Sequence, residues 1–107
     1  MMLTISETST FQRTWPDYWT EDERGEFASY LALTPDAGDV VPGTGGVRKV
    51  RWSRPGAGKR GGVRVVYFNR LADGQIWLLL IYSKSVRDNV PAELLKLLKQ
   101  EVTDAHD

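Results

Sequence analysis

Seven positively charged side chains, and no negatively charged one, lie between Val47 and Arg64 in a chain of 107 residues whose formal net charge is zero. They are Arg48, Lys49, Arg51, Arg54, Lys59, Arg60 and Arg64. Such a cluster binds a polyanion, and phosphate backbone is the commonest partner of this kind. Positively charged groups also stabilise the charge that develops on phosphorus when a phosphodiester is cut. The segment therefore predicts contact with nucleic acid, with or without cleavage.

The other charges are distributed unevenly along the chain. Residues 1–46 hold 2 Lys+Arg against 8 Asp+Glu, residues 47–90 hold 10 against 2, and residues 91–107 hold 2 against 4. The segment charges of −6, +8 and −2 sum to zero, so the positive charge is local. The acidic face of the helix expected after Thr20 is either an ordinary solvated face or a shield for the basic segment.

Several kinds of chemistry are excluded or disfavoured by composition. The absence of cysteine excludes disulfides, thiolate metal sites and cysteine nucleophiles. The single histidine, His106, is next to the last residue, where we expect a solvated tail rather than a catalytic side chain. Gly58-Lys59 fails the phosphate-loop motif, because Ser53 replaces the first glycine and Arg60 the final Ser or Thr.

No apolar run in the sequence approaches the length of a membrane span. The longest, Ile76–Tyr82, has seven residues, whereas a helical span requires about 20. The first residues also lack the features of a signal peptide. We therefore expect a cytoplasmic protein that does not contact a membrane.

The elements that position the basic residues are predicted from periodicity and turn signals. Alternation predicts a strand over Leu3–Glu7, and a helical stretch follows near Ser9–Arg13. Thr20 and Glu23 have the spacing of a capping box, ahead of a helix that ends near Thr34. Three strands and a last helix come next, at Val47–Trp52, Val63–Phe68 and Ile76–Tyr82 and from about Pro91.

This pattern predicts an α+β fold over residues 1–107, as a single domain. The order is β-α-(α)-β-β-β-α, with helices packed on one face of a small, mainly antiparallel sheet. Strand alternation places Lys49 and Arg51 on one face and Arg48 on the other. We therefore expect Lys49 and Arg51 in the site, and Arg48 at its rim or in a structural role.

Three stretches resemble the HigB-like branch of the RelE toxin superfamily: Gly43–Arg51, Gly58–Tyr67 and Leu80–Lys84. The expected order of strands and helices also agrees with this family. The resemblance implies a RelE-like fold and a ribosome-dependent endoribonuclease, the toxin of a type II toxin–antitoxin system. Such a toxin cuts mRNA in the ribosomal A site, near 16S rRNA, through attack of the RNA 2′-hydroxyl and without a metal or cofactor. The implied protein partner is a HigA-like helix-turn-helix antitoxin, whose complex with the toxin binds operator DNA.

The resemblance also implies roles for single residues. Lys49 and Arg51 match basic residues that contact the RNA backbone, and Arg64 matches an arginine that stabilises charge on the scissile phosphate. Lys84 matches the basic residue after the last strand. These four residues, Arg64, Lys84, Lys49 and Arg51, are the predicted catalytic set.

A second set is predicted to bind RNA: Lys59, Arg60, Arg48, Tyr67 and Tyr82. The chain departs from RelE at Ser85 and Pro91, where RelE has a catalytic arginine and a tyrosine. The general base is therefore left open among the lysines, Tyr67 and Tyr82. Two other functions also remain open, because fold alone does not decide among them. One is inhibition of DNA gyrase, as in the ParE branch, and the other is passive RNA binding.

Overall fold

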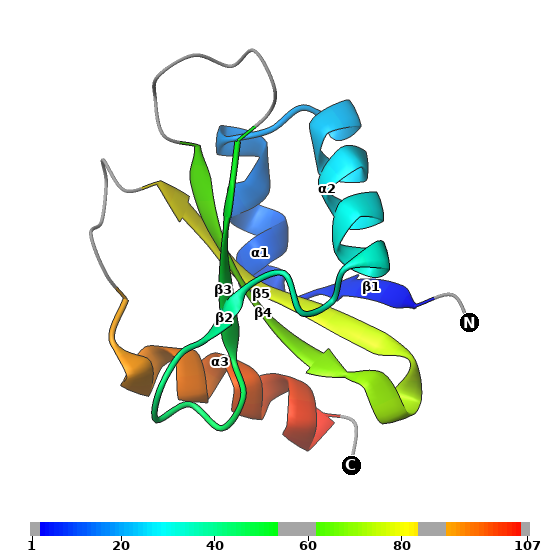
Figure 1. Cartoon of the computed structure of the whole chain (residues 1–107). Coiled ribbons are helices and arrows are strands. Elements are labelled where there is room, and N and C mark those ends of the chain that lie inside the picture. Colours follow the sequence, from blue (N-terminus) through cyan, green and yellow to red (C-terminus); the bar gives the residue numbers. More distant parts are fainter. Residues whose placement is uncertain (1–2, 54–61, 84–89, 106–107) are drawn as a thin grey trace.

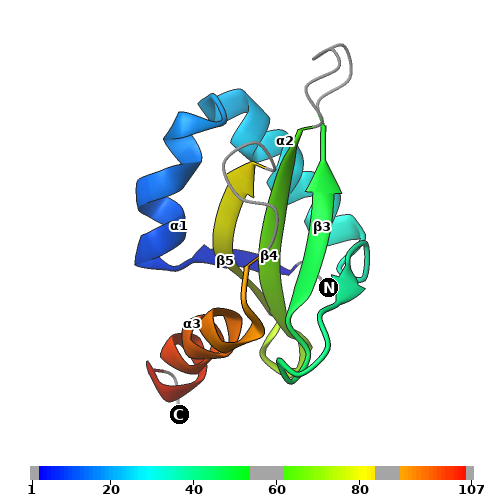
Figure 2. The same cartoon turned by 90° about the vertical axis from the view of Figure 1, so that its left-hand side faces the viewer.

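The protein, described by a computed structural model over residues 3–53, 62–83 and 90–105, contains a five-stranded sheet with helices on both faces (Figures 1 and 2). The elements are β1 (Thr4–Glu7), α1 (Ser9–Thr14), the 3-10 turn η1 (Trp15–Asp17), α2 (Glu21–Leu33), β2 (Asp39–Val40), β3 (Arg48–Trp52), β4 (Val63–Arg70), the 3-10 turn η2 (Leu71–Asp73), β5 (Gln75–Ser83) and α3 (Ala92–Ala105). The strand order is β1-β5-β4-β3-β2. β1 pairs with β5 in parallel and the other neighbours are antiparallel. The predicted α+β class with a mainly antiparallel sheet is confirmed.

The helix starts follow from side-chain caps. Thr8 precedes α1, where its Oγ1 accepts a hydrogen bond from the Phe11 amide at 3.1 Å and donates to the Leu79 carbonyl at 2.9 Å. This residue therefore fixes α1 against β5. The predicted capping box of α2 is confirmed: the Glu23 amide donates to Thr20 Oγ1, and the Thr20 amide donates to Glu23 Oε1.

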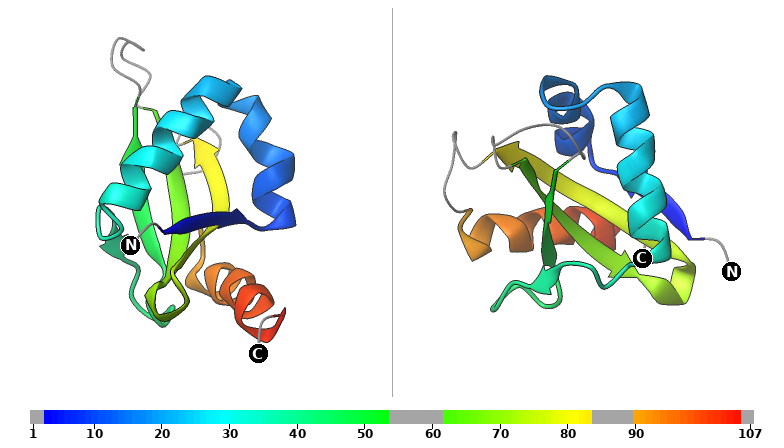
Figure 3. Two further views of the ribbon diagram at one scale, coloured as in Figure 1. Left: turned by 90° about the vertical axis from the view of Figure 1, so that its right-hand side faces the viewer. Right: turned by 45° about the horizontal axis from the view of Figure 1, so that its top comes forward.

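The expectation that all helices share one face of the sheet is wrong. α1 and α2 cover one face and α3 covers part of the other (Figure 3). We call these the α1–α2 face and the α3 face. β5 carries apolar residues on both sides, so both of its sides must be covered to remove that surface from water. The buried residues of the α1–α2 face include Phe11, Phe27, Val50, Val65 and Tyr67, and those of the α3 face include Val47, Val66, Leu79 and Leu98.

α3 buries only part of its apolar residues. Leu95, Leu98 and Val102 are buried against the sheet and Leu94 is partly buried, but Leu97 is 59% exposed. A helix packed on a flat sheet buries a limited arc, and Leu97 lies outside it. Within the part of the chain that the structure describes, no helix has the length and apolar character to cross a membrane.

Candidate nucleic-acid interface

Three predicted site residues lie together on the α3 face, and we call them the basic sheet surface: Lys49, Arg51 and Arg64. Arg51 on β3 is the direct cross-strand partner of Arg64 on β4. Lys49 lies two residues before Arg51 and therefore on the same face. Val50 and Val65, the sequence neighbours of these residues, point into the core under α1 and α2. Lys49, Arg51 and Arg64 therefore point to the opposite face, which is the α3 face. The predicted separation of Lys49 and Arg51 from Arg48 is confirmed, while their roles stay predictions.

The three side chains differ in exposure but all reach the surface. Arg51 is exposed, and Lys49 and Arg64 are half-buried. Cβ atoms of direct cross-strand partners are about 5 Å apart, so the Arg51 and Arg64 guanidinium groups can contact one phosphate together. Each guanidinium can also make two parallel hydrogen bonds to phosphate oxygens. The register of the two arginines therefore makes them a candidate contact for a phosphodiester.

Tyr82 on β5 is the next residue in the same cross-strand row, because it is the direct partner of Arg64. It lies on the α3 face, but only 5% of the residue is exposed. Its ring packs within the apolar cluster under α3. A role for its hydroxyl beside Arg64 stays a prediction.

The other predicted cations cannot be placed. Lys84 directly follows Ser83, the last residue of β5, and lies outside the described residues. Lys59 and Arg60, in the connection between β3 and β4, also lie outside them. Their assignments as catalytic and RNA-binding residues therefore stay predictions.

The predicted RNA contact of Tyr67 is wrong. Tyr67 is completely buried on the α1–α2 face, and its hydroxyl is fully engaged within the fold. The hydroxyl accepts a hydrogen bond from the Gly38 amide and donates one to the Pro35 carbonyl, both at 2.9 Å. Burial raises the pKa of this hydroxyl, although the Gly38 hydrogen bond and the charge of Arg48 oppose the increase. Tyr67 is therefore unsuited to act as a general base for RNA.

Arg48 also has a structural role, and its predicted RNA contact stays a prediction. It is the cross-strand partner of Tyr67, and its Nη1 donates a hydrogen bond to the Gly38 carbonyl at 2.6 Å. Gly38 thus connects β3, through Arg48, to β4, through Tyr67. A side chain cannot be added there, because a Cβ would lie 2.6 Å from the Lys49 carbonyl oxygen. Gly38 therefore helps to place Lys49.

Comparison with a solved structure identifies the fold. The structure is similar to that of the E. coli toxin RelE. The match, to a mutant of that toxin in the free state, has a TM-score of 0.64 and covers 92% of this chain and 98% of that chain at 10% sequence identity. No protein-family model matches the sequence. The chain therefore has a RelE-like fold, and its activity has to be argued from its own residues.

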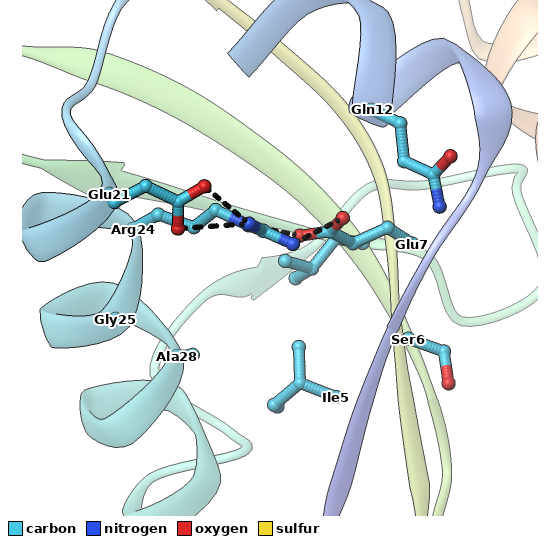
Figure 4. Close-up of a pocket in the computed structure, with 9 residues that line it drawn as sticks. Ile5, Ser6, Glu7, Gln12, Glu21, Arg24, Gly25 and Ala28 are labelled. Atoms are coloured by element: carbon cyan, nitrogen blue, oxygen red, sulfur yellow. Dashed lines mark hydrogen bonds and ion pairs between the residues drawn. The ribbon is translucent and has the colours of Figure 1, made fainter. Parts of the chain in front are cut away.

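A charged cluster that no sequence motif indicates lies on the α1–α2 face, and Figure 4 shows its side chains. The Arg24 guanidinium on α2 makes two hydrogen bonds to the Glu7 carboxylate on β1, at 2.8 and 3.0 Å, and approaches Glu21 at 3.3 Å. It also lies 4.6 Å from the centre of the Trp15 ring. The hydrogen bond to Glu7 is the main cause that raises the pKa of Arg24. Glu7 and Arg24 are 17 positions apart, and no spacing motif relates them.

These charged groups line a pocket of about 520 Å³ between β1 and α2. Figure 4 shows Glu7, Arg24 and Glu21 pointing toward one another, not toward open space. Glu7 is on the α1–α2 face, because its cross-strand partner is Leu78 of that core. The cluster is therefore a clasp between β1 and α2, and it lies away from the basic sheet surface.

Proposed function

We propose that the protein is the toxin of a type II toxin–antitoxin system, and that it cuts mRNA in the A site of the ribosome. One observation carries the proposal: a RelE-like sheet brings Lys49, Arg51 and Arg64 together on one face. The HigB-like motifs in the sequence support the same function. Concentrated positive charge on adjacent strands suits an RNA phosphate more than the protein surface that a gyrase inhibitor contacts.

The proposed reaction uses the 2′-hydroxyl of the RNA as its nucleophile. The 2′-oxygen attacks the neighbouring phosphorus, the bond from phosphorus to the 5′-oxygen breaks, and the products are a 2′,3′-cyclic phosphate and a 5′-hydroxyl. Arg64 and Arg51 stabilise the added negative charge on the phosphate oxygens. Lys49, two residues before Arg51 on the same face of β3, holds the RNA backbone in position.

A general base must remove the 2′-hydroxyl proton, and a general acid must protonate the leaving 5′-oxygen. Tyr82 carries a hydroxyl and is the direct partner of Arg64 on β5, where 5% of the residue is exposed. Lys84 comes two positions later in the chain and is the second candidate. We leave the division of these two roles open between Tyr82 and the lysines, since either type can transfer a proton.

The HigB-like motifs also support a set of partners. We infer that a HigA-like helix-turn-helix antitoxin neutralises the protein, and that operator DNA is bound only through the complex of the two. The ribosome, including 16S rRNA near the A site, completes the substrate. The expected location of the protein is the cytoplasm, where its substrate is found.

The test is to induce the protein in cells and to sequence the 5′ ends of mRNA. New 5′ ends that require ongoing translation are expected, together with arrest of protein synthesis. The control is induction of Arg64→Ala at equal protein level, which should leave the transcripts intact. Loss of DNA supercoiling before any mRNA is cut would instead establish the gyrase function. RNA binding without new 5′ ends would establish a passive RNA-binding module.

A further inference from the structure

A cationic pocket lies at the other end of β3 from Arg51, between α3 and the connection that precedes β3. Figure 1 shows these two segments, which the Lys99–Gly45 hydrogen bond joins. The pocket has a volume of about 380 Å³, and we call it the loop–helix pocket. The lining residues are Gly43, Thr44 and Gly45 of the connection and Lys96, Lys99, Gln100 and Thr103 of α3. The helical residues have i, i+3, i+4 and i+7 spacing and therefore form one polar face beside the apolar stripe. No carboxylate is among the described residues that line the pocket.

The loop wall of the pocket is held in a fixed conformation. Thr44 is 2% exposed, and its Oγ1 donates a hydrogen bond to the Val41 carbonyl and accepts one from the Val47 amide. Gly43 and Gly45 have φ angles of 77° and 76°, which favour glycine. A Cβ on Gly43 would have no atom within 4 Å, so a ligand can approach the backbone there.

The ammonium group of Lys99 is also positioned in advance. Its Nζ donates a hydrogen bond to the Gly45 carbonyl at 2.8 Å and lies 4.8 Å from the centre of the Phe68 ring. An ammonium group has three donors, so the Gly45 contact leaves others for a ligand. Lys96 is exposed on the preceding turn of the same helical face. Two ammonium groups and the Gln100 amide beside an open backbone suit an oxyanion. The Thr44 and Thr103 hydroxyls take no part as donors, because each already donates to a backbone carbonyl.

The pocket is within reach of the same RNA as the basic sheet surface. Gly45 precedes Arg51 by six positions, so at about 3.3 Å per residue the two are separated by at most on the order of 20 Å. Both lie on the side of the sheet that α3 covers, since Val47 and Phe68 contact the α3 cluster. A single strand of several nucleotides spans such a distance.

We propose that the loop–helix pocket binds a backbone phosphate of RNA, outside the basic sheet surface and without taking part in cleavage. The proposal rests on the proposed function for the identity of the polyanion. Glu93, one turn before Lys96, is exposed and is not among the lining residues. Its charge weakens the attraction to phosphate without blocking the pocket. The matched pair of substitutions Lys96→Gln and Glu93→Gln should therefore change RNA affinity in opposite directions.

The test measures binding of 2′-O-methylated single-stranded RNA, which cannot be cut by its own 2′-hydroxyl, over a series of salt concentrations. The plot of log affinity against log salt should lose a slope of about 0.7 in Lys96→Gln for one lost phosphate contact. Arg13→Gln, which removes a cation from the exposed end of α1, is the control and should keep the wild-type slope. Lys96→Gln combined with Lys99→Gln should weaken binding further. Equal slopes in the wild type and Lys96→Gln on both free RNA and ribosomes, or an equal loss in Arg13→Gln, would overturn the proposal.

A second arm repeats the titration with purified ribosomes and so separates ribosomal RNA from mRNA as the source of the phosphate. A slope change on ribosomes alone assigns the phosphate to ribosomal RNA, and a change on free RNA supports the mRNA strand. Failure of the wild type to bind either free RNA or ribosomes would overturn the proposed phosphate site.

In cleavage assays on translating ribosomes, Lys96→Gln should raise KM and leave kcat unchanged. If Lys96→Gln reduces the slope but the wild type does not cleave mRNA, the phosphate site stands and the nuclease proposal fails. If the wild type cleaves mRNA but Lys96→Gln leaves the slope unchanged, the nuclease proposal stands and the phosphate site fails.

Discussion

Arg51 and Arg64 are direct cross-strand partners on adjacent strands, so two guanidinium groups face the same side of the sheet from neighbouring positions. Like charges in this arrangement oppose folding, typically by a fraction of a kcal/mol, because the repulsion is relieved when the strands separate. A bound phosphate reverses the sign of the interaction, since its oxygens attract both groups. We therefore expect a polyanion bound at this pair to stabilise the sheet.

The first prediction concerns Arg51. Arg51→Gln should raise the free energy of unfolding by roughly 0.2–1 kcal/mol at low salt, because it removes the repulsion with Arg64. The gain should shrink as salt is added, since Arg51 is exposed and its charge is screened. Urea unfolding at two salt concentrations measures both effects. A variant less stable than the wild type at low salt would show that Arg51 has an attractive partner in the fold.

The second prediction concerns catalysis by Arg64. Arg64→Ala should lower the rate of mRNA cleavage on ribosomes by on the order of 10²–10³, because one donor to the charged phosphate is lost. Arg64→Lys should recover only part of that loss, since an ammonium group cannot make the paired hydrogen bonds of a guanidinium. The comparison is made on variants with wild-type circular dichroism. A folded Arg64→Ala protein with the wild-type cleavage rate would remove Arg64 from the mechanism.

The third prediction separates Tyr67 from the site. Tyr67→Phe leaves the buried Gly38 amide without its acceptor and should reduce the free energy of unfolding by about 1–3 kcal/mol. The Pro35 carbonyl should be less affected, because Asn69 Nδ2 also donates to it at 2.8 Å. Cleavage by the folded variant should equal that of the wild type. A Tyr67→Phe protein of normal stability but without activity would restore Tyr67 as a functional residue.

The fourth prediction is a pH dependence of stability caused by Tyr67. Burial raises the pKa of its hydroxyl in the folded protein above the ordinary value of 10.0. Below that value the hydroxyl is protonated in both states and its contribution to stability is fully present. As the pH rises further, the unfolded chain loses the proton first, so stability falls toward the folded pKa. The wild type should therefore lose more free energy of unfolding than Tyr67→Phe between about pH 9 and pH 11, and parallel curves would contradict the buried neutral hydroxyl.

Much of the fold follows from local signals in the sequence. The capping box of Thr20 and Glu23 is a short-range pattern, and the structure forms both of its hydrogen bonds. Alternation along β3 correctly separated Lys49 and Arg51 from Arg48, because side chains on a strand point to opposite faces in turn. The same rule also applies to Tyr67, whose odd spacing from Arg64 places it on the opposite face.

Other features depend on contacts between distant parts of the chain. The covering of both sheet faces by helices depends on where α3 packs, which local sequence signals do not give. The apolar residues on both sides of β5 are the local sign of it. The contacts of Gly38 with Arg48 and Tyr67 span 10 and 29 positions. No periodicity relates residues at such separations, so the structural roles of Arg48 and Tyr67 became visible only in the folded chain.

The last prediction tests the clasp between β1 and α2 by a double-mutant cycle. Arg24→Gln should reduce the free energy of unfolding by about 2 kcal/mol, because the Glu7 carboxylate, whose side chain is only 10% exposed, loses two charged hydrogen bonds. Glu7→Gln should also destabilise, and the double variant should lose less than the sum of the two by roughly 0.5–3 kcal/mol.

Glu21→Gln is the matched control for this cycle, because it removes the third member of the same cluster. The Glu21 side chain is 75% exposed, so its ion pair should contribute at most about 1 kcal/mol. All of these folded variants should cut mRNA at the wild-type rate, since the clasp lies on the α1–α2 face and Arg64 on the other. Additive losses would show that Glu7 and Arg24 act independently. Loss of cleavage by a stable Arg24→Gln protein would instead show that the pocket beside Arg24 takes part in function, because a purely structural clasp changes stability and leaves the basic sheet surface intact.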